Sequence, residues 1–293
     1  MVKDKNKTKK ETVRLSVQAL WTVPTNSFVT GFLKGKIYTG PLKNLCVPGM
    51  NCYSCPGALG SCPIGALQSV IGDRNYHFAF YVVGFLMLVG AVCGRFVCGW
   101  LCPFGLFQDL LHKIPFIKKI KTFKGDRILR KLKYIILALF VIILPMCVAD
   151  ALGIGDPWFC KYICPVGTLE GGIPLVLLND PLRQTIGWLY TWKIAILVIL
   201  IVLSVIMYRP FCKYLCPLGA IYGAFNKISA VGLHCDKDKC ISCRKCEKVC
   251  KMAVYPAENP RSSECIRCGL CVKECPTKAL RLGAEINKVS DKK

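Results

Sequence analysis

The sequence is poor in histidine and in acidic side chains. It holds three histidines, His77, His112 and His234, and 17 Asp and Glu against 40 Lys and Arg in 293 residues. No C-x-x-C-H motif occurs, which argues against a c-type haem. No two histidines share an apolar stretch, so a pair that would hold a b-type haem between helices is also missing. Redox groups, if present, must be bound mainly by other side chains.

Ionisable groups are also rare inside the long apolar stretches. The chain is 53% hydrophobic with a mean hydropathy of +0.43, which is too apolar for an ordinary soluble domain of this size. The composition therefore predicts an integral membrane protein without a proton relay, and no residue is assigned a catalytic role. Basic residues alternate with the apolar stretches instead of gathering on one soluble module, so nucleic acid is not an expected partner.

Four apolar stretches are predicted to be membrane spans. They are residues 13–32, 78–94, 134–149 and 194–208. The first is interrupted by polar residues, but the distribution of Lys and Arg between the loops favours a span there. If it spans, the two outer loops, 34–75 and 153–190, hold only four and two Lys or Arg. A signal peptide is the alternative for 13–32, but no small-residue cleavage site follows it. We predict a multi-pass protein of the prokaryotic cytoplasmic membrane with both termini in the cytoplasm.

Cysteine, in contrast, is abundant, with 21 residues. The run C-x2-C-x2-C-x3-C occurs twice near the end of the chain, and the second run is followed by Pro276. In this spacing three thiolates surround one cubane while the fourth reaches the neighbouring cluster. Structural zinc also uses paired C-x2-C, but it leaves two complete, interleaved quartets unexplained. The predicted ligand sets are Cys240, Cys243, Cys246 and Cys275 for one 4Fe-4S cluster, and Cys265, Cys268, Cys271 and Cys250 for the other.

An internal repeat carries a second type of cysteine motif. Residues 95–105 and 209–219 share the pattern R-x2-C-x3-C-P-x-G at an offset of 114. Each copy supplies two thiolates, and a cubane needs four ligands. The two copies together predict an inner cluster near the cytoplasmic face. Its ligands would be Cys98, Cys102, Cys212 and Cys216. The alternative is that these cysteines are small apolar side chains at helix ends.

The outer loops carry six more candidate ligands. Cys46, Cys52, Cys55 and Cys62 would close one cluster locally, or Cys160 and Cys164 would complete one across the repeat. Disulfides are the alternative, since thiols that face an oxidising compartment can pair. The C-P-x-G context favours iron, because it repeats that of the inner motifs. We predict one outer cluster and leave a second open, so the chain would bind at least four 4Fe-4S clusters, with a fifth undecided.

These elements predict a fold in two parts. The first is a membrane all-α, four-helix transmembrane bundle, built as a duplicated two-helix unit, and the second is a C-terminal α+β two-cluster ferredoxin domain. The predicted division is a basic cytoplasmic N-terminus at 1–12, a transmembrane domain at 13–231, the cytoplasmic ferredoxin domain at 232–283 and a polar tail at 284–293.

Over residues 76–280 the sequence resembles the NapH/NosR-type membrane-bound polyferredoxins. The resemblance is carried by Cys98/Cys102-Pro103, by Cys212/Cys216-Pro217 and by the two terminal quartets. It implies electron transfer between a quinol or a cytoplasmic donor, such as a ferredoxin or a reductase, and an extracytoplasmic redox partner. Some members use an extracytoplasmic flavin domain for this. Here no flavin domain or covalent-flavin threonine motif is present and the outer cysteines are extra, so a flavin would lie on the partner.

The expected function is one-electron transfer through 4Fe-4S clusters across the membrane. Two alternatives are a quinol dehydrogenase subunit and a thiol-disulfide relay that uses the outer cysteines. The hydrocarbon core is about 30 Å thick, so clusters at opposite helix ends would be too far apart for one efficient transfer. Either the outer loops fold back, with 173–178 as a re-entrant segment, or a second outer cluster lies deeper. Such a backbone must be buried in protein, which favours a homodimer or a larger complex.

Overall fold

The computed structural model describes residues 5–72, 80–115, 119–148 and 155–284 of the chain. Most of these residues are helical, and the described part contains one sheet of two strands. In chain order the elements are α1 (Lys5–Thr25), α2 (Val29–Lys34), η1 (Pro41–Asn44), α3 (Pro63–Gly72), α4 (Phe80–Cys93), α5 (Phe96–Trp100), α6 (Pro103–Lys113), α7 (Asp126–Leu129), α8 (Leu132–Ile136), η2 (Leu137–Ile143), α9 (Leu144–Cys147), η3 (Phe159–Ile163), α10 (Pro165–Gly167), η4 (Thr168–Gly172), α11 (Ile173–Leu178), α12 (Asp180–Gln184), α13 (Trp188–Ile206), α14 (Pro210–Tyr214), α15 (Pro217–Phe225), β1 (Val231–Cys235), α16 (Lys245–Val249), α17 (Leu270–Glu274) and β2 (Leu280–Ala284).

One helix has the length and composition of a membrane span. In the described ranges only α13, with 19 residues, is long and apolar enough, and at about 1.5 Å per residue it covers about 28 Å. The predicted span 78–94 corresponds to α4, which has 14 residues, and 134–149 is divided among α8, η2 and α9. Residues 78, 79 and 149 lie outside the described residues. The mostly helical fold is confirmed, whereas a bundle of four spans stays a prediction.

The predicted span 13–32 is divided between α1 and α2. Pro24 lies in the last turn of α1, and beyond it the N–H of Phe28 donates to the carbonyl of Gly57 at 3.1 Å. Gly31 of α2 packs so tightly on this loop that a Cβ there would lie 2.1 Å from the carbonyl oxygen of Pro56. The helix therefore ends where the chain begins to pair with the outer cysteine loop, and a regular helix through 32 would lose these contacts.

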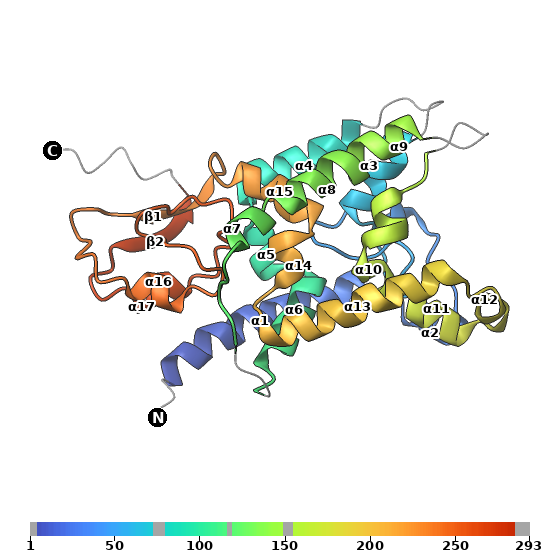
Figure 1. Cartoon of the computed structure of the whole chain (residues 1–293), viewed down its shortest axis with the longest axis horizontal. Coiled ribbons are helices and arrows are strands. Elements are labelled where there is room, and N and C mark those ends of the chain that lie inside the picture. The colour runs from blue at the N-terminus through green and yellow to red at the C-terminus, as the bar shows by residue number, and fades with distance from the viewer. Residues whose placement is uncertain (1–4, 73–79, 116–118, 149–154, 285–293) are drawn as a thin grey trace.

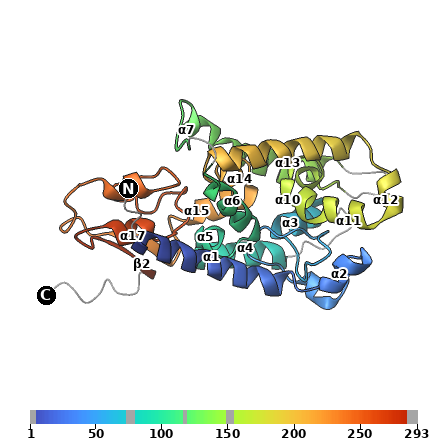
Figure 2. The same ribbon diagram turned by 90° about the horizontal axis from the view of Figure 1, so that it is seen from below.

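The elements are arranged in a row along the long axis of the molecule. The two strands, α16 and α17 form one end, α5, α14 and α15 lie at the centre, and α10, α11 and α12 lie toward the other end (Figure 1). The long helices α1 and α13 run along the central part, and α13 packs against α6 (Figure 2). The two halves of the internal repeat thus meet in the middle of the molecule.

The C-terminal module is a small α+β unit. Strand β1 pairs with β2 in antiparallel register, from Val231 opposite Ala284 to Cys235 opposite Leu280. These strands begin and end close to the predicted limits 232 and 283. The predicted polar tail lies outside the described residues except for its first residue, Ala284.

The buried core is built around thiols. Its apolar residues enclose cysteines from both repeats and from the outer loops, so the predicted ligand loops lie inside the fold. Core members include Cys46, Cys62, Cys98, Cys102, Cys164, Cys216, Ile64, Phe104, Phe211, Leu218 and Tyr222.

Candidate iron-sulfur sites

The inner cysteines of the two repeats line one cavity. Cys98 lies on α5 and Cys212 on α14, and Cys102 and Cys216 immediately precede α6 and α15. All four are buried and surround an empty volume of about 320 Å³, together with Met50 and apolar side chains. No described group of three or more His, Cys, Asp or Glu converges closely enough to hold a single metal ion. Cluster binding at this cavity stays a prediction, but the four predicted ligands do meet.

Local backbone geometry aims these thiols at the cavity. Cys102 and Cys216 have extended backbone angles, with ψ of 116° and 112°, and each is followed by the proline that begins the next helix. Proline suits this first helical position because its missing N–H is not needed there. A Cβ on Gly105 would lie 3.2 Å from the carbonyl oxygen of Cys98, and one on Gly219 would lie 3.3 Å from that of Cys212. The glycines allow this close approach.

Two arginines tie the repeats together reciprocally. Arg95 begins the first repeat and donates from Nη2 to the carbonyl oxygen of Cys212 at 2.8 Å. Arg209 occupies the matching position in the second repeat and donates from Nη1 to the carbonyl oxygen of Cys98. Both side chains are fully buried. Each arginine therefore holds the first cysteine of the other repeat and brings positive charge near the thiols.

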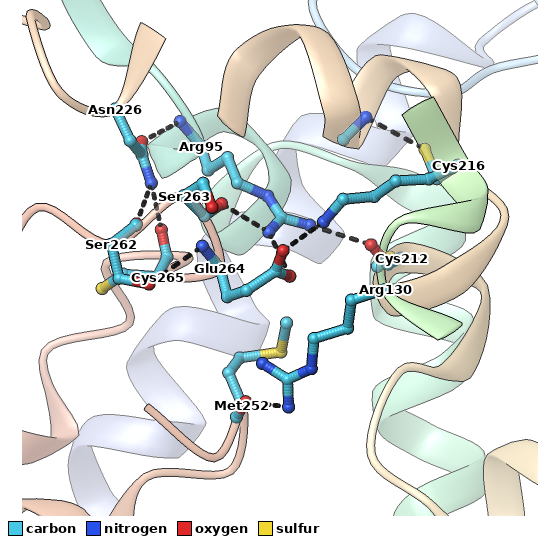
Figure 3. A network of polar contacts seen from close by, with 12 residues as sticks. Arg95, Arg130, Cys212, Cys216, Asn226, Met252, Ser262, Ser263, Glu264 and Cys265 are labelled. Atoms are coloured by element: carbon cyan, nitrogen blue, oxygen red, sulfur yellow. Dashed lines mark hydrogen bonds and ion pairs between the residues drawn. The ribbon is translucent and has the colours of Figure 1, made fainter. Parts of the chain in front are cut away.

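Two buried carboxylates balance part of this charge. Asp109 accepts from Arg209 at 2.6 and 2.7 Å and pairs with Arg14 at 2.7 Å. Burial would raise the pKa of Asp109, but Arg209 and Arg14 lower it to about 2. Glu264 pairs with Arg95 at 3.0 Å and with Lys133, as Figure 3 shows for Arg95. Two carboxylates are thus shared among several buried cations.

The surplus of buried cations fits an anionic group. The buried basic residues of this region are Arg14, Arg95, Lys133, Arg209, Lys213 and Arg267, against Asp109, Asp126 and Glu264. Unpaired buried charge is strongly unfavourable, so the arrangement needs further negative charge nearby. Burial raises the pKa of Cys98 and Cys216, so these thiols would be neutral alone. A bound metal deprotonates its thiol ligands, and four thiolates at the cavity would supply the missing charge.

Hydrogen-bond donors also point at the sulfurs. The N–H of Gly219 donates to Cys216 Sγ at 3.3 Å, and Gln108 Nε2 donates to Cys212 Sγ at 3.3 Å. The other end of the Gln108 amide accepts from the N–H of Phe211 at 3.2 Å. Sequence reasoning missed this glutamine. Its signal was present, since Gln108 follows Cys102 by six residues, as Gln68 follows Cys62.

Replacing Gln108 by leucine should lower the reduction potential of the inner site. Its N–H···S bond favours the more negative, reduced state, because hydrogen bonds to sulfur raise cluster potentials. A difference of about 1 kcal/mol corresponds to about 40 mV for one electron. Redox titration followed by electron paramagnetic resonance measures the shift. Gln184→Leu, on exposed α12, is the control and should leave every potential unchanged; an unshifted Gln108→Leu variant would contradict the assigned contact.

The first terminal quartet also surrounds a cavity. Its empty volume is about 350 Å³, and its lining includes the four cysteines predicted from the interleaved spacing, Cys240, Cys243, Cys246 and Cys275. The lone residue that comes late in the chain, Cys275, thus lies with the three early ones. Pro276 and Tyr255 line the same cavity.

The second terminal quartet repeats the geometry of the first. Non-glycine residues adopt left-handed backbone angles at Ser242 and Arg244, with φ of 51° and 53°, and the matching positions 25 residues later are Arg267 and Gly269, with φ of 54° and 76°. Such angles are costly outside glycine, so the same backbone path is imposed in both loops. Burial, and then the thiols of Cys268 and Cys250, raise the pKa of Cys265 to about 12. Cys250 therefore lies with the second quartet, as the interleaved spacing predicts.

The second quartet adjoins the inner cavity. Trp100 Nε1 on α5 donates to the carbonyl oxygen of Arg267 at 3.1 Å. A Cβ on Gly99 would lie 2.3 Å from the carbonyl oxygen of Ile266. Asn226 accepts from the N–H of Arg95 and donates to the carbonyl of Cys265 at 2.8 Å (Figure 3). The loop that carries Cys265 is thus packed directly on the helix that carries Cys98.

The outer cysteines are divided between two surroundings. Cys62 and Cys164 are buried immediately before α3 and α10, Cys160 lies in η3, and the N–H of Cys52 donates to Glu170 Oε2 at 2.7 Å. Cys46 pairs through its backbone with Ser61, and Cys55 Sγ contacts Asn26 Oδ1 at 3.8 Å. All 21 cysteines lie in the described ranges, and all are free thiols there. Cys147 at the end of α9 is exposed.

Comparison with known proteins identifies 4Fe-4S binding domains in the chain. A family model described as a 4Fe-4S binding domain matches residues 75–124, 134–173 and 190–233, and a second model with the same description matches 261–281. The uncharacterized protein MJ0750 of Methanocaldococcus jannaschii is 30% identical over 236 residues, which cover 78% of this chain and 89% of that protein. The ferredoxin-type protein NapH of Haemophilus influenzae is 28% identical, with coverage of 74% and 73%.

A methylamine utilization ferredoxin-type protein, MauN of Paracoccus denitrificans, is 28% identical over 64% of this chain and 58% of its own length. No solved structure matches the chain. The predicted resemblance to NapH and NosR is confirmed, since both are among the relatives found. With its repeated cysteine motifs and terminal quartets, the chain belongs to the family of ferredoxin-type 4Fe-4S electron-transport proteins.

Proposed function

We propose that the protein transfers single electrons across the prokaryotic cytoplasmic membrane, from a cytoplasmic donor to an extracytoplasmic redox partner. The route would run from the first terminal quartet to the second, then to the inner cavity and to the outer cysteines. The observation that carries the proposal is the unbroken sequence of packed thiol sites along the long axis of the molecule. A 4Fe-4S cluster, when bound at a site, supplies a one-electron store there.

The transfer from the second quartet to the inner cavity is supported by direct packing. The carbonyl contacts of Trp100 and Asn226 hold the Cys265 loop against α5. Glu264 and the buried cations Arg95 and Lys133 fix the same junction electrostatically. These residues exclude water and keep the spacing between the two sites constant, which is the contribution that a protein makes to electron transfer.

The transfer from the inner cavity to the outer cysteines is supported by one loop. Gly49 and Met50 line the inner cavity. A Cβ on Gly49 would lie 2.9 Å from Cα of Cys102, and Cys62 Sγ lies 3.9 Å from Met50 Sδ. Adjacent residues of this loop therefore contact one cysteine of each site. This packing supports an outer loop that folds back to the inner site, so that the two sites would lie closer than the separation of about 30 Å expected between opposite faces.

Tyr222 lies near thiols of both sites. It is fully buried on α15, and its hydroxyl donates to the carbonyl oxygen of Pro48 at 3.1 Å. Burial raises its pKa, and the nearby thiols of Cys98 and Cys62 raise it further. A fully buried aromatic ring near both sites supports a dry path between them.

Electrons would enter at the exposed end of the ferredoxin module. Cys243 is exposed, and Lys237, Lys239, Lys245 and Lys248 around the first quartet are exposed as well. A basic surface steers an acidic donor, such as a small ferredoxin or a reductase. Lys251 pairs with Glu11 and serves the fold instead. The acceptor on the other face would carry its own cofactor, such as a flavin.

Proteoliposomes test this function. Ferricyanide is trapped inside, dithionite is added outside, and valinomycin with potassium prevents a membrane potential. Each electron released by dithionite then reduces one ferricyanide, whose loss of absorbance is recorded. We expect a rate at least tenfold above that of protein-free liposomes. Equal rates with anaerobically purified, iron-replete protein would overturn the proposal, and protein-dependent ferricyanide reduction driven by a quinol in the membrane in place of dithionite would favour the quinol dehydrogenase alternative.

A further inference from the structure

The arrangement of the outer cysteines repeats that of the inner site. In the inner site Cys102-Pro103 begins α6 and Gln108 follows six residues after the cysteine; in the outer site Cys62-Pro63 begins α3, with Gln68 in the same place. On the opposite side, Cys216-Pro217 begins α15 and Cys164-Pro165 begins α10. In each site, two Cys-Pro helix beginnings from different segments of the chain thus lie close together.

The glutamines make the same contacts in both places. Gln68 Nε2 donates to Cys160 Sγ at 3.2 Å, and its Oε1 accepts from the N–H of Phe159 at 2.9 Å. Gln108 makes the equivalent pair of contacts with Cys212 and Phe211, at 3.3 and 3.2 Å. Both glutamines are fully buried. Each Nε2 also donates to the carbonyl oxygen four residues earlier, that of Ile64 at 3.3 Å and that of Phe104 at 3.4 Å. The two buried amides therefore have matching partners, and Cys160 occupies the position that Cys212 has in the inner site.

The fourth ligand of the outer site differs from that of the inner one. Cys98 precedes Cys102 by four residues, whereas the residue four before Cys62 is Ala58. Cys52 replaces it in space: a Cβ on Gly167, three residues after Cys164, would lie 3.6 Å from Cys52 Sγ. On the other side, a Cβ on Gly65 would lie 3.9 Å from Cys160 Sγ. The thiol of Cys52 therefore lies near the beginning of α10, and the thiol of Cys160 lies near the beginning of α3.

The other two outer cysteines have different surroundings. The thiol of Cys55 contacts Asn26 Oδ1 at 3.8 Å. Cys46 pairs through its backbone with Ser61, and its N–H donates to the hydroxyl of Tyr81 at 3.1 Å.

We propose that Cys52, Cys62, Cys160 and Cys164 bind one 4Fe-4S cluster, and that Cys46 and Cys55 are not ligands. The chain then binds four clusters. The role of this cluster as the last electron carrier rests on the proposed function. The ligand set itself is tested independently of transport.

Iron and acid-labile sulfide of the anaerobically purified full chain provide the test. Wild type should hold about 16 iron atoms for four cubanes, and alanine variants of Cys52, Cys62, Cys160 and Cys164 should each hold about 12. Cys46→Ala and Cys55→Ala are the matched controls and should keep about 16. The assignment is overturned if the controls lose iron while Cys160→Ala and Cys164→Ala do not, or if wild type holds only about 12.

A milder variant covers the case in which a ligand variant fails to fold. Gln68→Leu should keep all iron and lower the potential of one paramagnetic signal, and this signal must differ from the one that Gln108→Leu shifts. A shift of the same signal, or no shift, contradicts the second site. If the iron counts agree with the assignment but wild-type proteoliposomes do not transfer electrons, the cluster stands and the proposed transmembrane function fails.

Discussion

Cys212→Ser should separate the protein into two redox halves. The variant loses one side of the inner cavity, so iron should fall by about four atoms, and ferricyanide reduction in proteoliposomes should fall at least tenfold. Both effects follow from position, because the inner cavity lies between the Cys265 loop and the loop at 49–52. The terminal quartets do not use Cys212, so their reduction by dithionite should persist. Iron analysis, spin quantification and the transport rate are measured on the same preparation.

The matched control is Cys93→Ser. Cys93 ends α4 close to the same junction, and its carbonyl accepts from Arg267, but it does not line the inner cavity. The backbone contact survives this substitution, so iron content and transport should match wild type. A Cys212→Ser variant that retains full transport would show that electrons bypass the inner site, and the proposed route would then be wrong.

Glu264→Gln should destabilise the junction between the ferredoxin module and the helical part by about 3–5 kcal/mol. Glu264 is the carboxylate that Arg95 and Lys133 share, and both cations are fully buried. Removing one member of a buried ion pair leaves uncompensated charge, which is far more costly than losing an exposed pair. Unfolding by denaturant in detergent, followed by iron release and by far-UV circular dichroism, measures the change. A loss below about 1 kcal/mol would contradict the expectation.

The control for this variant is Glu247→Gln. Its partner Arg244 lies 4.0 Å away, and both side chains are substantially exposed. Exposed pairs of this kind contribute about 0–1 kcal/mol, so the variant should behave as wild type. The two substitutions make the same chemical change in the same module and differ only in burial.

The contribution of Glu264 should also depend on pH. Burial disfavours its charged form, but Arg95 and Lys133 outweigh burial and lower its pKa below the usual range. The ordinary pKa of Glu is about 4.3. A lowered pKa in the folded state stabilises the protein above that value, and this stabilisation is lost as the pH falls below about 4.3 toward the folded-state pKa. The difference in the free energy of unfolding between wild type and Glu264→Gln should therefore shrink in that acidic range.

The buried charges of the centre were the least predictable part of the chain. Asp109 and Arg209 are 100 residues apart, and Arg95 and Glu264 are 169 apart. Hydropathy treats each of them as a surface residue, since isolated charges are seldom buried. Only the convergence of both repeats with the ferredoxin module makes their burial favourable, because each then finds a partner and the thiol sites need positive charge.

Helix lengths show a second limit of sequence reasoning. The apolar run at 78–94 ends within one residue of α4, which stops at Cys93, where Gly94 takes a left-handed φ of 50° and Asn226 accepts from the N–H of Arg95. The run at 13–32 ends its first helix at Thr25 because the next residues pair with the outer cysteine loop. Hydropathy records apolar composition, whereas helix ends depend on such distant partners.

The amino-acid sequence by itself determined the two terminal quartets, their interleaving and the repeated C-x3-C-P motif. Ligand spacing within a short loop is a local property, so reading along the chain is enough to find it. Tertiary structure alone decided which distant thiols share a cavity, because Cys98 and Cys102 meet Cys212 and Cys216 only after the residues between the two repeats have folded back. It also decided that the outer loop reaches the inner site, since Gly49 and Met50 line the inner cavity, and Met50 Sδ lies 3.9 Å from Cys62 Sγ, only when both repeats are packed together.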